Sequence, residues 1–419
     1  MNNQHFMIGT KPMETPARIE PCGIEEGTPP ALGESMLELQ ERAQNLGRSL
    51  HPDAAAELRD MTKIMNAYYS NLIEGHNTRP RDIKAALDGR LDDVEDRPLA
   101  LEAAAHVRVQ SWIDGMLDLD QRIEPTSQAF IRDVHRRFYE GMPEEFLVMR
   151  EGDRELEIVP GAYRAPGQEV VVGNHVPPSA ERLEVFMAHF EMRYRGLTAG
   201  RLGRILSIPA AHHRLNYIHP FLDGNGRVSR LMSHAMVQAA GIHGRGLWSI
   251  SRGLARGLDD PSEYKDRMQA ADTPRQHDRD GRGNLSLDRL VSFSNWFLTV
   301  MIDQVRFSEA MFDLRGLEGR YTSLVSRLHP GKDRLTKLVS HVLRHGEVAR
   351  GDVQFVLGVQ ERAARKDVSV LTEAGFLRSA SPKGPLRIAF PLDYRETFFP
   401  NLFGTDEVNV PGPPDLPRL

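Results

Sequence analysis

The chain has 419 residues and a mass of 47.2 kDa, which predicts two or three domains. Its single cysteine, Cys22, excludes a disulfide framework and any site built from several thiolates. The net charge of −5 predicts no general attraction to nucleic acid, and no apolar run reaches the ~20 residues that span a bilayer. Because the first residues also lack a signal-peptide pattern, we expect a soluble, cytoplasmic protein without membrane association.

The N-terminal part of the chain predicts an arm followed by helices. Residues 1–33 are rich in Pro, Gly, Glu and Thr without a hydrophobic period, which predicts a flexible arm. Apolar residues at spacings of three and four then predict helices over residues 33–46, 52–72, 81–91, 99–119 and 126–139. We assign residues 34–97 to N-terminal helices and residues 98–325 to a helical core.

Residues 156–176 interrupt this helical pattern. The run Glu169–Gly173 is β-branched and ends in glycine, and Pro166-Gly167 marks a turn, so we expect a β-hairpin here. Helical periodicity resumes over residues 179–195, 201–217, 227–240 and 290–314. The expected fold class is therefore mostly α, a helical bundle with one β-hairpin.

The pattern changes again after residue 330. Three short helices are predicted over residues 335–345, 349–357 and 359–374, followed by two strands over 375–377 and 386–390. This order is typical of a winged helix-turn-helix, a small α+β module, which we assign to residues 330–403, with a tail over 404–419.

The charge of the C-terminal module bears on its partner. Residues 334–403 hold 11 Lys and Arg residues and 7 Asp and Glu residues, a net charge of +4. The predicted recognition helix presents three cations, Arg362, Arg365 and Lys366. The same helix carries three acidic residues that would oppose phosphates, Glu361, Asp367 and Glu373. We therefore favour protein contact over DNA binding.

The most informative segment runs from His219 to Arg230. It joins a helix that ends before Pro220 to a helix that begins near Asn225, and two glycines let its backbone N–H groups approach an anion. Arg227 and Arg230 lie on one helix face, where they can clamp phosphates.

Two further groups of this segment carry chemistry. Asp223 offers a hard oxygen ligand of the kind that Mg²⁺ takes together with substrate phosphates. His219 is the group that can take a hydroxyl proton near neutral pH. Each feature alone is common at helix ends and turns. Together, within twelve residues, they predict transfer of a phosphate-containing group from a nucleotide.

Residues 219–230 match the signature H-x-F-x-D/E-G-N-G-R-x-x-R at all eight specified positions, and the chain therefore resembles the Fic-domain family. The likeness covers roughly residues 60–310. Most members are protein adenylyltransferases, which move AMP from ATP onto a Ser, Thr or Tyr hydroxyl of a protein. The resemblance implies ATP as substrate, Mg²⁺ as cofactor and a protein target, the chain itself included.

The resemblance also implies roles for the matched residues. His219 would be the general base and Asp223 the Mg²⁺ ligand. Arg227 would hold the α- and β-phosphates and Arg230 the γ-phosphate, while Phe221 would pack under the loop. The anion hole would be formed by Gly224, Asn225 and Gly226.

Two more distant assignments follow from the same resemblance. Tyr264 is similar to the adenine-side tyrosine of relatives, although its residue type alone favours a core aromatic. A flap beside the active loop would pair with an extended segment of the target, by adding a strand to an exposed edge. This edge would be formed by Val170, Val171 and Val172.

A second motif implies regulation. Ser70 to Gly75 fits the inhibitory pattern S/T-x-x-x-E-G/N of the family. Glu74 would form a bidentate ion pair with Arg230, so that ATP binds with its phosphates misplaced for in-line attack. We therefore expect an auto-inhibited adenylyltransferase.

Alternatives stay open at this point. Glu74 could instead position a water that removes AMP from a modified protein. The chain could also be a DNA-binding regulator that senses nucleotide without catalysis, although the intact His219 argues against this. UTP and CDP-choline are alternative donors, and a homodimer is an alternative assembly.

Overall fold

The structure is a computed structural model that describes residues 15, 16, 20, 30–118, 123–151, 154–173, 175–196 and 200–403. Its first helices are α1 (Pro30–Asn45), α2 (Pro52–Ile73), α3 (Pro80–Leu87), α4 (Arg97–Asp118), α5 (Gln128–Tyr139), α6 (Leu183–Gly196), α7 (Arg201–Ile218) and α8 (Asn225–Ala239). The later helices are α9 (Ile250–Arg256), α10 (Glu263–Ala271), α11 (Leu287–Met311), α12 (Leu314–Leu328), α13 (Asp333–His345), α14 (Val353–Leu357), α15 (Glu361–Glu373) and α16 (Arg395–Phe398). Most of the predicted arm and the whole of the predicted tail lie outside the described residues.

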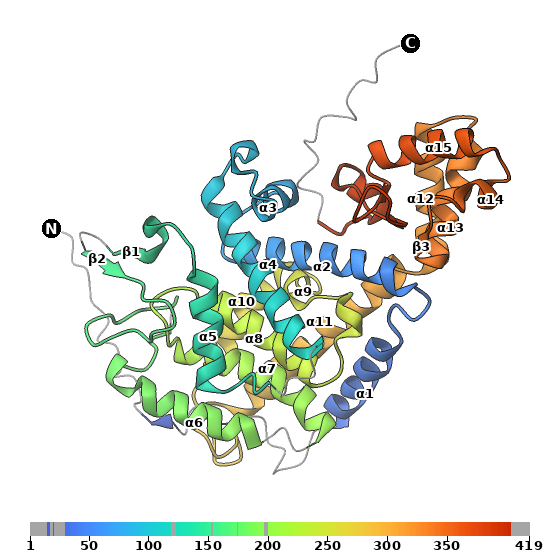
Figure 1. The fold of residues 1–419 in the computed structure, drawn as a ribbon. Helices are drawn as coiled ribbons and strands as arrows, with labels where there is room; N and C mark the ends of the chain where they lie inside the picture. Colours follow the sequence, from blue (N-terminus) through green and yellow to red (C-terminus); the bar gives the residue numbers. More distant parts are fainter. Residues whose placement is uncertain are drawn as a thin grey trace. The chain divides into compact units, whose positions relative to one another are not determined.

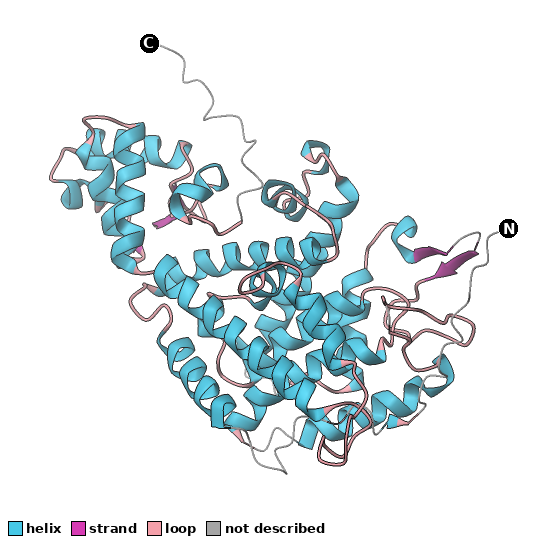
Figure 2. Ribbon diagram, turned by 180° about the vertical axis from the view of Figure 1, so that it is seen from behind, coloured by secondary structure: helices cyan, strands magenta, loops and turns pink. Residues whose placement is uncertain are grey.

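Helices dominate the described part of the chain, as Figure 2 shows, and the prediction of a mostly α fold is confirmed. One sheet pairs β1 (Val148–Glu151) with β2 (Arg154–Glu157). A second sheet has the strand order β3 (Glu347–Val348), β5 (Leu386–Ile388), β4 (Leu377–Arg378). No helix in the described ranges combines the length and the apolar character that a bilayer crossing requires.

The chain forms two compact units. The first comprises Met1–Gln40, Ala105–Ile242 and Gly253–Ile302, and the second comprises Glu41–Ala104, His243–Arg252 and Asp303–Leu419. In the first unit α7 packs along α8, and α5 contacts both α6 and α8 (Figure 1).

Helix α8 is buried on all its sides, polar residues included. Polar groups inside a protein need hydrogen-bond partners, and α8 finds them both on a neighbouring helix and within itself. His234 lies 2.7 Å from the Asp114 carboxylate of α4, and the Ser233 hydroxyl donates to the Ser229 carbonyl at 2.8 Å. These bonds fix the helix that carries Arg227 and Arg230.

The predicted strand at Glu169–Gly173 is wrong. The structure forms only an isolated bridge between Val172 and His175 there, and the hairpin lies earlier in the chain, at β1 and β2. In the register of that bridge, Val170 would face Pro177, which has no N–H to donate, so the ladder ends after one pair. The β1–β2 hairpin escaped prediction because its strands are mostly charged.

Among the described residues four helices were not predicted, namely α9, α10, α12 and the four-residue α16. Helix α12 contains Gly316 and Gly319, which weaken a helical pattern in sequence. Its start is set by Asp313, whose carboxylate accepts a hydrogen bond of 2.8 Å from the Gly316 N–H. The hydrophobic period predicted one helix up to residue 314. This cap instead ends that pattern and starts α12 as a separate helix after α11.

The C-terminal segment of the second unit has the predicted order of helices and strands. Helices α13, α14 and α15 are followed by β4 (Leu377–Arg378) and β5 (Leu386–Ile388). A short strand that was not predicted, β3 (Glu347–Val348), pairs antiparallel with β5.

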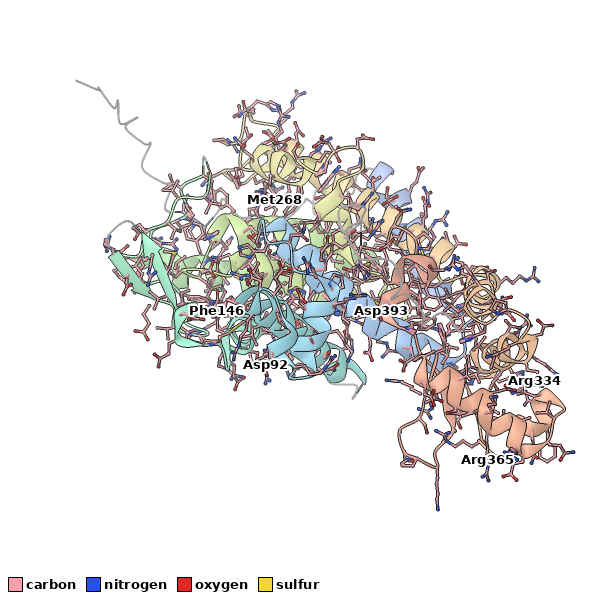
Figure 3. The ribbon with its side chains drawn as sticks, turned by 90° about the horizontal axis from the view of Figure 1, so that it is seen from above. Asp92, Phe146, Met268, Arg334, Arg365 and Asp393 are labelled. Atoms are coloured by element: carbon pink, nitrogen blue, oxygen red, sulfur yellow. The ribbon has the colours of Figure 1, made fainter. Side chains whose placement is uncertain are left out.

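Asp367 was expected to present its charge to solvent, and this prediction is wrong. Its side chain is buried and accepts a hydrogen bond of 2.8 Å from Nε of Arg334, on α13. Arg362, Arg365 and Lys366 of the same helix are exposed, as predicted. Arg334 and Arg365 are labelled in Figure 3. One of the three acidic residues expected to oppose phosphates is therefore neutralised inside the fold.

Tyr321 of α12 ties this segment together from within. Its ring is buried, and its hydroxyl lies 2.9 Å from the Phe376 carbonyl and 2.6 Å from the Ala389 carbonyl. Burial raises the pKa of Tyr321 well above its ordinary value, so the hydroxyl stays a donor at any physiological pH.

We expect Tyr321→Phe to lower the free energy of unfolding by about 1–3 kcal/mol, because two buried carbonyl groups lose their shared donor. Urea-induced unfolding measures this change. Tyr394→Phe is the matched control, since Tyr394 stacks on the same Phe376 ring but is only partly buried. Equal unfolding midpoints for the two variants would contradict the role of the Tyr321 hydroxyl.

Candidate active site

The segment from His219 to Gly224 joins the end of α7 to the start of α8, and two residues bend it. His219 has left-handed backbone angles, φ 50° and ψ 60°, and Gly224 has φ 81°. For a residue other than glycine this conformation costs on the order of 1–3 kcal/mol, so the surroundings must hold His219 in place. At Gly224 a Cβ atom would lie 3.1 Å from the Tyr139 hydroxyl, so this position also needs glycine for space.

Asn225 closes the loop from the helix side. Its Oδ1 accepts from the Phe221 N–H at 2.9 Å, and its Nδ2 donates to the Phe221 carbonyl at 2.8 Å. The Phe221 ring is fully buried and stacks on the His135 ring, with centroids 4.0 Å apart and planes 8° apart. Phe221 thus packs under the loop, where the resemblance placed it.

His135 supports the same loop with a defined tautomer. Its Nδ1 accepts from the Gly161 N–H at 2.8 Å, so its Nε2 carries the proton and donates to the Asp223 carbonyl at 3.3 Å. Burial lowers the pKa of His135 to about 4, which keeps the ring neutral near pH 7.

The first turn of α8 presents backbone donors. The first hydrogen bond within the helix runs from the Val228 N–H to the Gly224 carbonyl, at 2.9 Å. The N–H groups of Asn225, Gly226 and Arg227 precede it and have no carbonyl within the helix to bond. Gly224 has no side chain to cap them, so this helix start can bind an anion.

Asp223 and Arg227 contact one another at the mouth of the loop. Arg227 Nη2 donates to Asp223 Oδ2 at 2.7 Å, and the Tyr139 hydroxyl donates to the same oxygen. The Asp223 side chain is 44% exposed, whereas the Arg227 guanidinium lies over the Phe138 ring, 5.0 Å from its centroid. The carboxylate is thus accessible beside a fixed cation.

The carboxylate of Asp223 fits a Mg²⁺ ion whose coordination shell is completed by the phosphates of the substrate. Mg²⁺ is held by one or two carboxylates together with phosphate oxygens and water. Asp223 supplies one accessible carboxylate just before the N-terminal turn of α8. Within the described ranges no three His, Cys, Asp or Glu side chains gather to hold a metal without a substrate.

Arg230 lies deep in the first unit, where it is 2% exposed. Burial, and next the charge of Arg230, lower the pKa values of His106 and His212 to about 3, so both rings stay neutral. His212 lies 2.9 Å from the Ser233 hydroxyl and 2.8 Å from the Tyr264 hydroxyl. Tyr264 is itself buried, and this bond anchors it beside α7 and α8.

Arg164 also contacts this loop, and the sequence analysis did not identify it as a site residue. Its backbone N–H donates to the Pro220 carbonyl at 2.9 Å, and its Nε donates to the His219 carbonyl at 3.0 Å. No signal in the sequence pointed to this role, because the partner His219 lies 55 residues further along the chain.

The predicted flap residues lie on the surface of the first unit. Val171 is 70% exposed and Val172 is 40% exposed, while Val170 is partly buried. An exposed extended segment is compatible with strand addition. The role of Val170, Val171 and Val172 in target binding stays a prediction.

The inhibitory motif lies at the end of α2, in the second unit. The Gly75 N–H donates to the Leu72 carbonyl and the His76 N–H donates to the Asn71 carbonyl, at 3.0 and 2.9 Å. These two bonds form a Schellman motif, and Gly75, with φ 91°, occupies the position that favours glycine. Glu74 is therefore the C-cap residue and Ser70 is buried within the helix; the Glu74–Arg230 ion pair stays a prediction.

Known proteins resemble this chain in sequence. The protein adenylyltransferase Fic of Aedes aegypti is 31% identical over 184 residues, which are 42% of this chain and 32% of that protein. The protein of the same name from Drosophila erecta is 29% identical over 218 residues, 50% of this chain and 39% of that protein. The chain thus spans about a third of the length of these curated relatives.

Solved structures of low sequence identity also align. A Fic family protein from Desulfovibrio desulfuricans G20 covers 89% of this chain and 99% of its own, with 17% identity and a TM-score of 0.49. A Fic domain containing signaling protein from Bacteroides thetaiotaomicron covers 65% of this chain and 96% of its own, with 20% identity and a TM-score of 0.47.

The family comparison covers the whole of the loop built above. Residues 125–237 match the model of the Fic/DOC family, a range that begins before α5 and ends within α8. Over residues 125–237, this chain is therefore similar to the Fic/DOC family.

Proposed function

We propose that this chain is a Mg²⁺-dependent protein adenylyltransferase that transfers AMP from ATP to a Ser, Thr or Tyr hydroxyl. The observation that carries the proposal is the geometry of residues 219–230. A histidine ends α7 beside the anion-binding start of α8, and two arginines follow on that helix. The Fic domain and the name of the curated relatives, protein adenylyltransferase Fic, support the same activity.

In the proposed reaction His219 accepts the proton of the target hydroxyl as its oxygen attacks the α-phosphorus of ATP. A bond forms between that oxygen and the α-phosphorus, the bond from the α-phosphorus to the bridging oxygen breaks, and pyrophosphate leaves. The N–H groups at the start of α8, with Arg227 and Arg230, stabilise charge on the phosphates. Mg²⁺ held by Asp223 would neutralise further charge on the phosphate oxygens.

We further propose that Glu74 holds the enzyme mostly inactive by pairing with Arg230. Once its guanidinium is engaged by a carboxylate, Arg230 no longer positions the γ-phosphate, and the α-phosphorus is misaligned with the hydroxyl. The proposal is supported by the motif Ser70–Gly75 and by the helix end that keeps Glu74 at the C-cap of α2.

For the C-terminal module, residues 330–403, we propose a winged helix that contacts protein. Phe355 of α14 is 76% exposed, so it offers an apolar side chain that a protein partner would bury. Arg365 of α15 is paired with Glu361, which reduces the charge that this helix offers to phosphates.

We expect His219→Ala to lower AMP transfer at least a hundredfold, because a positioned general base contributes this much or more. The measurement is incorporation of label from α-labelled ATP into the protein itself. The affinity for ATP should stay within about twofold, because the phosphate contacts remain. His277→Ala, a partly exposed histidine outside the loop, is the control and should keep full activity. A His219→Ala variant that matches this control would show that another group is the base.

We expect Glu74→Gly to raise auto-modification with labelled ATP at least tenfold, because Arg230 becomes available to the γ-phosphate. Glu140→Gly is the matched control, since Glu140 is also an exposed C-cap residue of a helix. An unchanged rate in Glu74→Gly removes the inhibitory role. Release of AMP from a previously modified protein by the wild type, and not by Glu74→Gly, would favour the reverse reaction instead.

A further inference from the structure

Arg164 is a buried cation that reaches three segments of the first unit. Its Nε donates to the His219 carbonyl at 3.0 Å, and its Nη2 donates to the Pro178 carbonyl. Its Nη1 donates to Glu169 Oε2 at 3.1 Å. The guanidinium is fully buried, so each of its donors needs a partner, and these contacts supply three.

Glu169 connects this cation to the segment that carries the exposed valines. Its Oε2 accepts from Arg164, and its Oε1 accepts from the Ala180 N–H at 3.2 Å. The Glu169 side chain is 52% exposed, although its partner is fully buried. Glu169 directly precedes Val170, so any chain that pairs with Val170–Val172 would lie next to this carboxylate.

The bond to the His219 carbonyl connects these contacts to the proposed general base. His219 is held in a left-handed conformation, and its backbone angles decide where the imidazole points. The Arg164 Nε bond acts on the carbonyl of this residue, and the Arg164 N–H acts on the next carbonyl, that of Pro220. Two donors from one residue therefore fix the two peptide units that follow His219, on either side of the Pro220 Cα.

We propose that Arg164 is a positioning residue for His219, and that the Arg164–Glu169 ion pair couples the segment Val170–Val172 to the base. The inference rests on the proposed function, because it assigns the position of the proposed base. Arg164 touches no reacting atom and acts only through the backbone of His219. A target strand seated on Val170–Val172 would hold Glu169 in place, which keeps Arg164 on the His219 carbonyl.

The hairpin β1–β2 offers a matched control pair. Arg150 and Glu155 have the same spacing of five residues as Arg164 and Glu169, and Arg150 Nε donates to Glu155 Oε1 at 3.1 Å. Both side chains are largely exposed, and the pair contacts each other across the two strands. An exposed pair of this kind contributes little to stability.

The experiment compares Glu169→Gln, Arg164→Lys, Glu155→Gln and Arg150→Lys, each in the Glu74→Gly background of the full chain. The rate of AMP incorporation from saturating labelled ATP is measured in single turnover, and ATP affinity is measured separately by calorimetry. We expect Glu169→Gln to lower the rate threefold to tenfold and Arg164→Lys to lower it at least thirtyfold, with ATP affinity within twofold of the parent. Both control variants should match the parent.

Loss of ATP affinity in parallel with the rate would mean that Arg164 and Glu169 only maintain the fold, and this overturns the proposal. Rates equal to the controls overturn it as well. Should Arg164→Lys fail to fold, as judged by its melting curve, Glu169→Gln decides the question, because its partly exposed side chain keeps its shape. An inactive Glu74→Gly parent that binds ATP would instead overturn the proposed function and this inference with it.

Discussion

Three consecutive carbonyl groups, those of His219, Pro220 and Phe221, are each held by a donor from outside the loop. Arg164 supplies the first two donors and Asn225 the third. A loop held in this way keeps a left-handed residue that would otherwise relax. Its shape is therefore a property of the surrounding first unit, and the proposed base and the start of α8 depend on it together.

Burial sets the electrostatics around this loop. His135, His106 and His212 all have pKa values lowered chiefly by burial, so the neighbourhood holds neutral imidazoles together with the cations Arg164, Arg227 and Arg230. Neutral rings can both donate and accept hydrogen bonds, and they add no positive charge. Arg164 is paired with Glu169, so the positive charge that the site offers to a polyphosphate comes from the arginines of α8 and the helix start.

The sequence predicted the mostly helical class and the loop of residues 219–230, because the defining side chains of the loop lie within twelve residues. Local information sufficed there. It did not suffice for the hairpin, since the ladder at Val172 ends at Pro177, and that effect depends on register. Arg164 was missed because its contact depends on the tertiary fold: its partner His219 lies 55 residues away in the sequence. Asp367 was placed on the wrong side of its helix because its partner, Arg334, is 33 residues distant.

Asn225 and Gly226 form the dipeptide in which asparagine most readily deamidates, by attack of the following backbone nitrogen on the side-chain amide. In the folded chain the Asn225 amide is hydrogen-bonded to both the N–H and the carbonyl of Phe221. The attacking nitrogen, that of Gly226, belongs to the first turn of α8. Ring closure there is hindered as long as the fold persists. If it occurred after transient opening, the resulting carboxylate could no longer donate to the Phe221 carbonyl. Deamidation of Asn225 would then damage the loop irreversibly, and it would raise the mass of the protein by about one dalton.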